Sequence, residues 1–105
     1  MKFAQYSYPL LVALSTLAMH HACFAAGAAA DGKKLYQAFC AMCHGTELKA
    51  AGGIPDLRTT TLNDEAFVAV VREGRPNTIM LPMKNRLSDE EIGRIRAYIR
   101  TFAGG

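Results

Sequence analysis

The sequence lacks three features that would place it in large functional classes. Its longest apolar run, residues 9–19, has about ten residues, whereas a membrane-spanning helix needs roughly 20. Its 12 Lys and Arg nearly balance its 9 Asp and Glu, for a net charge of +3, which is too small a surplus to indicate nucleic-acid binding. It has no sustained alternation of apolar and polar residues, so β-strands are not expected. These absences favour a small all-α domain.

The amino-terminal residues 1–25 have the layout of a secretory signal peptide. Lys2 gives a positively charged start, residues 9–19 form a short apolar segment, and Cys23 and Ala25 are small residues before a cleavage site. We therefore expect cleavage after Ala25, removal of this segment on export, and a periplasmic location.

Two other interpretations of this segment remain. An uncleaved membrane anchor would need a longer apolar run. A lipid-modified Cys23 would normally follow a Leu-Ala-Gly sequence, whereas His20, His21 and Ala22 precede it here. Residues 26–105 are the expected functional domain. With about 80 residues, its side-chain core alone gives little stability, so a large apolar cofactor would help to stabilise it.

Two helices are expected in the first part of this domain. Residues 31–42 place Leu35, Phe39 and Met42 on one apolar stripe, which predicts a helix. Residues 63–74 begin with a capping asparagine and two acids, continue with an apolar run and end at a glycine. This pattern predicts the second helix.

A third helix is predicted near the carboxyl end, after two long loops. Ser88 and Glu91 have the spacing of a capping box. The residues expected on one apolar face are Ile92, Ile95, Ile99 and Phe102. Residues 45–62 and 75–86 contain glycine or proline and show no periodicity, so both are expected to be loops. Loops of this length are usually functional.

The residues with distinctive chemistry are concentrated in CAMCH, residues 40–44. The sequence has 3 Cys and 3 His, and loss of the signal peptide would leave Cys40, Cys43 and His44. A structural zinc site normally needs four such ligands. A thioredoxin-like dithiol starts a helix after a strand, and no strand is expected here. Two thiols at this spacing can instead attach to the vinyl groups of a porphyrin, with His44 as the proximal iron ligand. We favour this covalent haem c interpretation.

Several segments also carry a resemblance to a known family. They are LYQAFCAMCHG at residues 35–45, GGIPDLR at 52–58, MLPMKNRLSDEEI at 80–92 and AYI at 97–99. Together they resemble the small single-haem cytochromes c of bacteria (class I) across essentially all of residues 26–105. The resemblance implies a cytochrome c fold, with about three main helices and long loops around one haem. It also implies that the Pro55 carbonyl accepts a hydrogen bond from the proximal histidine and orients its ring.

The second loop, residues 75–86, is expected to supply the sixth iron ligand. No further histidine remains in the domain, so a methionine, a lysine or an open site are the candidates. The family pattern places a methionine seven residues before the Leu-Ser-Asp-Glu-Glu-Ile motif, which selects Met80. Leu81 stands where the family has proline, and Met83 stands where it has an aromatic residue. Met83 is the alternative ligand, and the methionine that does not bind iron is expected to fill the core, as is Met42.

An iron with one imidazole and one thioether ligand suits outer-sphere electron transfer. We therefore expect a one-electron carrier, not an enzyme, between a donor dehydrogenase or respiratory complex and an acceptor reductase or oxidase. The alternatives are an accessory or maturation subunit docked on a larger redox enzyme, and a haem enzyme with an open sixth site. The segments also resemble the cytochrome domains of quinohaemoprotein alcohol dehydrogenases and small cytochromes that serve nitrite reductases.

Basic residues suggest contacts with the haem and with partners. Arg58 follows the proline loop, and its guanidinium suits bidentate binding of a haem propionate, although an ordinary surface arginine fits as well. The basic residues that could surround an exposed haem edge are Lys33, Lys34, Lys49, Lys84 and Arg86. Such a ring would steer an acidic redox partner into a transient complex, and a simply solvated surface is the alternative. The protein itself is expected to be a monomer or to form only transient complexes.

Overall fold

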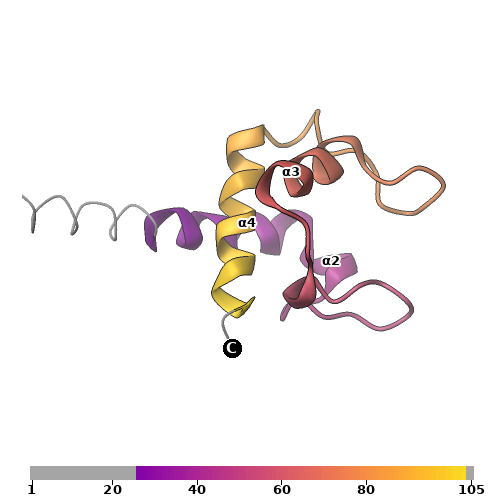
Figure 1. Cartoon of the computed structure of the whole chain (residues 1–105), viewed down its shortest axis with the longest axis horizontal. Helices are drawn as coiled ribbons and strands as arrows, with labels where there is room; N and C mark the ends of the chain where they lie inside the picture. Colours follow the sequence, from indigo (N-terminus) through magenta and orange to yellow (C-terminus); the bar gives the residue numbers. More distant parts are fainter. Residues whose placement is uncertain (1–25, 104–105) are drawn as a thin grey trace, which may run out of the picture.

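The computed structural model describes residues 26–103, and these residues form helices joined by loops, with no strand (Figure 1). Residues 26–39 are helical. The elements that follow are α2 (Ala41–His44), the 3-10 helix η1 (Leu57–Thr59), α3 (Asp64–Glu73) and α4 (Asp89–Ala103). The all-α prediction is therefore confirmed over this part of the chain. The predicted signal peptide, residues 1–25, lies outside the described residues.

The first helix departs from its prediction at Cys40. The helix covers residues 26–39, and a turn at Cys40, with φ −119°, separates it from α2. Because this turn changes the helical phase, the apolar stripe that reaches Phe39 does not continue to Met42. Met42 is 99% exposed, so the expectation that it fills the core is wrong.

The helix α3 follows its sequence signals closely. The side chain of Asn63 caps the helix by accepting a hydrogen bond from the Ala66 amide at 2.8 Å. The helix ends at Gly74, whose φ of 71° is a conformation that glycine adopts readily. Phe67 and Val71 are the buried residues of the helix. Both predicted ends of this element are confirmed.

The capping box predicted at the start of α4 is present. The Ser88 amide donates to Glu91 Oε1 at 3.0 Å, and the Glu91 amide donates to Ser88 Oγ at 3.1 Å. The buried residues of its apolar face include Ile92, Ile95 and Ile99. Phe102 differs from them, because it is 36% exposed and packs edge-on against Tyr98 with ring centroids 5.2 Å apart.

The first helix crosses α4 at close range (Figure 1). A Cβ atom at Gly32 would lie 1.8 Å from the carbonyl oxygen of Arg94, so only glycine permits this approach. One turn later, the rings of Tyr36 and Tyr98 lie 5.6 Å apart. The buried core consists of Tyr36, Leu48, Phe67, Val71, Leu87, Ile92, Ile95, Tyr98 and Ile99. This core joins the first helix, α3 and α4 with the first loop.

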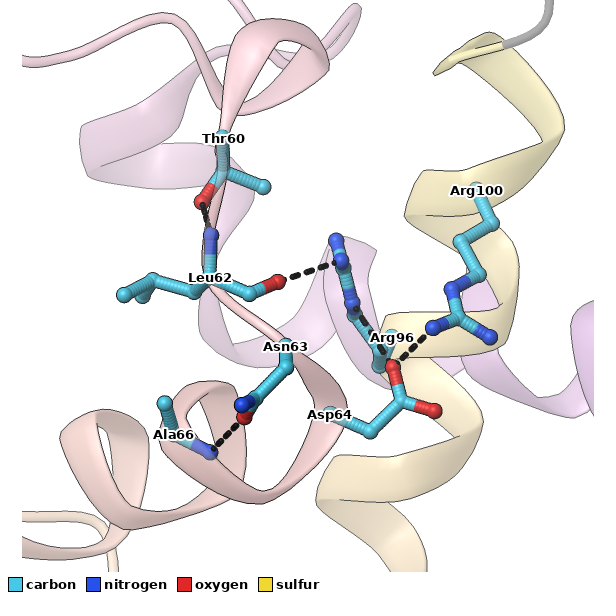
Figure 2. A network of polar contacts seen from close by, with 7 residues as sticks. All are labelled: Thr60, Leu62, Asn63, Asp64, Ala66, Arg96 and Arg100. Carbon is cyan, nitrogen blue, oxygen red and sulfur yellow. Dashed lines mark hydrogen bonds and ion pairs between the residues drawn. The ribbon is translucent and has the colours of Figure 1, made fainter.

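A buried arginine joins α4 to the start of α3 (Figure 2). Arg96 is 9% exposed, and it donates to the Leu62 carbonyl at 2.8 Å and to Asp64 Oδ1 at 3.3 Å. Its guanidinium also lies over the Phe67 ring, 5.2 Å from the centroid. Arg100, one turn further along α4, pairs with the same carboxylate. These contacts fix the end of the first loop and the first turn of α3 against α4.

Both long loops extend to the same side of the molecule, the side on which α2 lies (Figure 1). The predicted loops 45–62 and 75–86 are confirmed, except that η1 interrupts the first of them. None of the described helices is long and apolar enough to cross a membrane. The fold thus brings both sequence segments with candidate ligands to the side of the CAMCH sequence.

Candidate cofactor site

The two cysteines of the CAMCH sequence lie in a single turn of chain around the start of α2. Cys40 is partly buried, Cys43 is exposed, and both are free thiols. Burial raises the pKa of the Cys40 thiol to about 11, with a smaller contribution from the neighbouring Cys43. A thioredoxin-like dithiol acts through a thiol with a lowered pKa, so this environment argues against that alternative.

The zinc alternative also lacks support in the geometry. Within residues 26–103, no group of three or more His, Cys, Asp and Glu side chains is arranged to hold a metal ion. A closed structural zinc site needs four such ligands. The two thiols and the adjacent imidazole are therefore better matched to a group that supplies most of the metal ligands itself.

One of the two ring nitrogens of His44 is buried without a hydrogen bond to the described residues. Its ring is partly buried, and Nδ1 is fully buried with no hydrogen-bond partner among the described residues. Desolvation lowers the pKa of the imidazole, which favours the neutral ring that can bind a metal ion. Leaving such a nitrogen unpaired costs about 1–3 kcal/mol. The expected bond from His44 to the Pro55 carbonyl is not formed in this structure, and Pro55 is exposed, so its role stays a prediction.

The loop that carries Pro55 is anchored in the core at Leu48. This residue is fully buried and has φ of 67°, a conformation that is unfavourable for leucine. Its carbonyl accepts a hydrogen bond from the Leu57 amide at 3.0 Å. This hydrogen bond joins the two ends of a loop that runs from Leu48 to Leu57. Pro55 lies near the end of this loop. Burial of the Leu48 side chain compensates for the backbone strain, because it removes a large apolar surface from water.

Arg58 is bound to Asp56, two residues before it. Its Nε donates to Oδ1 at 3.0 Å and its Nη2 donates to Oδ2 at 2.7 Å. These hydrogen bonds lower the pKa of the Asp56 carboxyl to about 2. Asp56 also caps η1 by accepting from the Arg58 amide at 2.9 Å. Arg58 Nη1 makes no hydrogen bond among the described residues, so one edge of the guanidinium is free for a second anion.

The second loop holds Met80 and Met83 in different ways, although both pack against the core. The Met80 carbonyl accepts from the Arg75 amide at 3.0 Å, which closes a small turn of six residues. The Met83 amide instead donates to the Val71 carbonyl of α3 at 3.1 Å. Met83 is therefore fixed to a helix, whereas Met80 lies in the projecting part of the loop. Both inward-facing thioethers remain candidates for the sixth ligand.

Two of the basic residues that were predicted to surround the haem edge make contacts within the protein. Lys84 pairs with Glu73 at 3.5 Å, and the Arg86 guanidinium lies 5.2 Å from the centroid of the Phe39 ring. The lysines of the first helix and the first loop, Lys33, Lys34 and Lys49, are exposed. The arrangement leaves at least part of this positive surface accessible to a partner.

Sequence reasoning missed Tyr36 as a residue that contributes to the site. Its hydroxyl donates to the carbonyl of Gly45, the residue directly after His44, at 2.5 Å. Tyr36 and Gly45 are nine residues apart, and the turn at Cys40 interrupts the helix between them. Helical periodicity therefore does not predict this hydrogen bond. The only sequence signal is a tyrosine in place of an aliphatic residue one turn before the first cysteine.

Comparisons with known proteins agree with this donor set. The chain is 36% identical over 90 residues to cytochrome c-554(547) of Halothiobacillus neapolitanus, a match that covers 73% of this chain and 99% of that cytochrome. It is 37% identical over 76 residues to cytochrome c550 of Pseudomonas aeruginosa, covering 67% of this chain and 52% of the relative. It is also 36% identical over 70 residues to the quinohemoprotein alcohol dehydrogenase ADH IIB of Pseudomonas putida, covering 65% of this chain and 10% of the enzyme.

No solved structure matches the chain significantly. The family model described as cytochrome C oxidase, cbb3-type, subunit III matches residues 27–99. This range includes both cysteines, the histidine and both methionines of the second loop. Members of such a family bind haem c through a Cys-x-x-Cys-His sequence, and the donor set above fits that group. The chain belongs to this family of c-type cytochrome domains, and it is a haem c electron carrier, not an enzyme.

Proposed function

We propose that this protein is an exported, periplasmic one-electron carrier with a single haem c held by Cys40, Cys43, His44 and Met80. The observation that carries the proposal is the turn at Cys40, which leaves two free thiols beside an imidazole whose buried Nδ1 lacks a hydrogen-bond partner within residues 26–103. When bound, the haem iron supplies one-electron chemistry that needs no proton or atom transfer. The protein therefore has to hold, orient and shield this group.

Each site residue has a distinct part in this proposal. Cys40 and Cys43 hold the haem through thioether bonds, and the neutral His44 ring is the proximal ligand. The Pro55 carbonyl accepts a hydrogen bond from Nδ1 and fixes the tautomer, as second-shell partners of ligating histidines generally do. That bond would give a partner to the buried nitrogen, which has none in the part of the chain that the structure describes. Met80 would supply the second protein ligand to the iron.

Arg58 is proposed to contact a haem propionate through its free edge. Its bond to Asp56 orients the guanidinium and leaves Nη1 available. A guanidinium has five N–H donors, so binding of one carboxylate does not exclude a second one. In this arrangement Asp56 holds the arginine in place rather than competing with the cofactor.

The proposal also concerns export and partners. Residues 1–25 are proposed to be a cleaved signal peptide, and residues 26–105 to be the cytochrome domain. The domain would transfer electrons in transient complexes, from a dehydrogenase or respiratory complex to a reductase or oxidase. The likeness to two quinohemoprotein alcohol dehydrogenases supports a dehydrogenase as donor. The exposed lysines would steer such a partner, so transfer rates should fall as ionic strength rises.

The decisive experiment is production of the full chain in a bacterium that attaches haem c. The purified protein should begin near residue 26, carry one haem that acid-acetone does not extract, and show a low-spin spectrum in both oxidation states. Carbon monoxide should bind slowly to the reduced form, because Met80 occupies the sixth position. Rapid stoichiometric binding would favour a haem enzyme with an open site. Serine in place of both cysteines should abolish retention of haem, whereas Met42→Ser, between them and fully exposed, should not.

A further inference from the structure

The Tyr36 hydroxyl forms a hydrogen bond that links the first helix to the chain just beyond α2. Tyr36 is fully buried, and its hydroxyl lies 2.5 Å from the Gly45 carbonyl oxygen. The same environment raises the pKa of Tyr36 to about 12, mainly because the ring is desolvated. The hydroxyl therefore remains a donor over the whole range of pH in which the protein is expected to work.

Gly45 is held at both its amide and its carbonyl. Its amide donates to the Ala41 carbonyl at 2.8 Å, within the cap of α2, and its carbonyl accepts from Tyr36 and, at 3.3 Å, from the Leu48 amide. Its φ is 84°, and a Cβ atom would lie 2.1 Å from the carbonyl oxygen of Lys49. The position thus has little freedom to shift.

His44 and Gly45 share the planar peptide unit that contains the Gly45 amide, and the Gly45 carbonyl that Tyr36 binds belongs to the next unit, toward Thr46. Fixing the atoms of Gly45 limits the rotation of the backbone that carries the imidazole. The ring itself has no side-chain restraint at Nδ1 among the described residues. Tyr36 therefore acts on the backbone of His44 through Gly45, the residue whose carbonyl its hydroxyl holds.

The position of Tyr36 is in turn set by the crossing of the first helix and α4. Its ring packs against Tyr98 of α4, with centroids 5.6 Å apart and planes inclined by 54°. Gly32, one turn before it, allows the two helices to touch. The hydroxyl bond therefore connects the rigid helix crossing to the residue next to the candidate iron ligand.

We propose that Tyr36 is a positioning residue, whose hydroxyl sets the orientation of the His44 imidazole and so tunes the electronic structure of the ligated iron. The inference rests on the proposed function, in which His44 is the proximal ligand. It differs from a purely structural role, because a structural hydroxyl would change stability without changing the iron's spectroscopic signature.

The test compares Tyr36→Phe with Tyr98→Phe in the haem-loaded protein. Both changes remove one hydroxyl from the same pair of packed rings, but Tyr98 makes no side-chain hydrogen bond among the described residues. Proton NMR of the oxidised protein reports the direction of the proximal imidazole through the spread of the haem-methyl shifts. Tyr36→Phe should change this spread and shift the reduction potential, and Tyr98→Phe should change neither.

A second measurement strengthens the hydrogen bond instead of removing it. Tyr36 and Tyr98 are the only tyrosines of residues 26–105, so fluorotyrosine in the Tyr98→Phe protein labels Tyr36 alone in this domain. Fluorination makes the hydroxyl a better donor, and the haem-methyl spread should move in the direction opposite to that of Tyr36→Phe. This labelled protein keeps the hydroxyl and does not depend on the folding of the phenylalanine variant.

The outcomes separate this inference from the proposed function. Parent protein without signals of a ligating histidine would remove the basis of the proposed function itself. If the parent protein shows these signals but Tyr36→Phe and Tyr98→Phe give identical spectra, only the positioning role is overturned. A loss of stability in Tyr36→Phe with unchanged spectrum and potential would also overturn it.

Discussion

Arg58 and Asp56 form a two-pronged ion pair across a single intervening residue, with Nε–Oδ1 and Nη2–Oδ2 distances of 3.0 and 2.7 Å. The pair lies directly after Pro55, and the same carboxylate caps η1. It therefore fixes the direction in which the chain leaves the proline. A loop that is expected to orient the proximal histidine is thus stiffened by a local contact and not by packing alone.

This ion pair predicts a component of stability that depends on pH. The pKa of Asp56 is lowered from 3.8 to about 2 in the folded protein, so the pair stabilises the fold fully above about pH 4 and progressively less as the pH falls to 2. The difference in urea midpoint between the parent and Asp56→Asn should follow this profile. Arg58→Gln should lose the same component, and the double variant should lose no more than either single variant. A difference that is as large at pH 2 as at pH 7 would contradict this origin.

Two glycines near the helix crossing give a matched pair for the packing argument. Gly32→Ala places a methyl group where the Arg94 carbonyl oxygen lies at 1.8 Å, so the helices must separate, and the free energy of unfolding should fall by at least about 2 kcal/mol. At Gly93, inside α4, a Cβ atom meets nothing within 4 Å. Gly93→Ala should therefore stabilise the protein by up to ~1 kcal/mol, because alanine is the better helix former. Thermal and urea unfolding of both variants measure this contrast, and equal effects would show that the crossing is not tight.

The arginines on α4 allow a similar comparison. Arg96 is buried and bonds both the Leu62 carbonyl and Asp64. The Arg100 side chain is 54% exposed and, among residues 26–103, pairs with Asp64 alone. Arg96→Ala should lower the free energy of unfolding by about 2–3 kcal/mol, because it leaves a partly buried carbonyl without its charged donor. Arg100→Ala should cost less than ~1 kcal/mol, as exposed ion pairs do. Similar losses for both would mean that the bond to Leu62 contributes little.

The sequence predicts the parts of the fold that depend on local signals. The Asn63 cap, the capping box of Ser88 and Glu91, and the glycine that ends α3 are all formed by residues within four positions of one another. Such contacts are specified by residue type and spacing, so they can be read without knowledge of the tertiary structure. The first helix was predicted from its apolar periodicity instead, and its predicted end at residue 42 is wrong, because the helix ends at residue 39.

Other features depend on contacts between distant segments and could not be predicted in this way. The phase change at Cys40 moves Met42 to the surface, although periodicity alone places it beside Phe39. The burial of Arg96 follows from its bonds to residues more than thirty positions earlier. The two loops carry no periodicity, so the sequence names Met80 and Met83 as candidates without fixing their distance from His44.

Met80 and Met83 are the two candidates for the sixth iron ligand. Both are partly buried against the core, but their main-chain contacts differ. Met83 is bound to Val71 of α3. Met80 lies between Ile79 and Leu81, which are 76% and 70% exposed, so its side chain turns inward from a projecting segment. A loop of this kind can adjust to bring a thioether to the iron, whereas Met83 would have to move with α3.

Met80→Ala should therefore abolish the sulfur-to-iron absorption band of the oxidised protein, lower its reduction potential and make carbon monoxide binding fast. Met83→Ala should keep the band and reduce the free energy of unfolding by about 1–2 kcal/mol, less than the full cost for a completely buried methionine. Optical spectra, a redox titration and urea unfolding of the two variants give these values side by side. Loss of the band in Met83→Ala alone would show that leucine at position 81, where the family has proline, accompanies a shifted loop in which Met83 is the ligand.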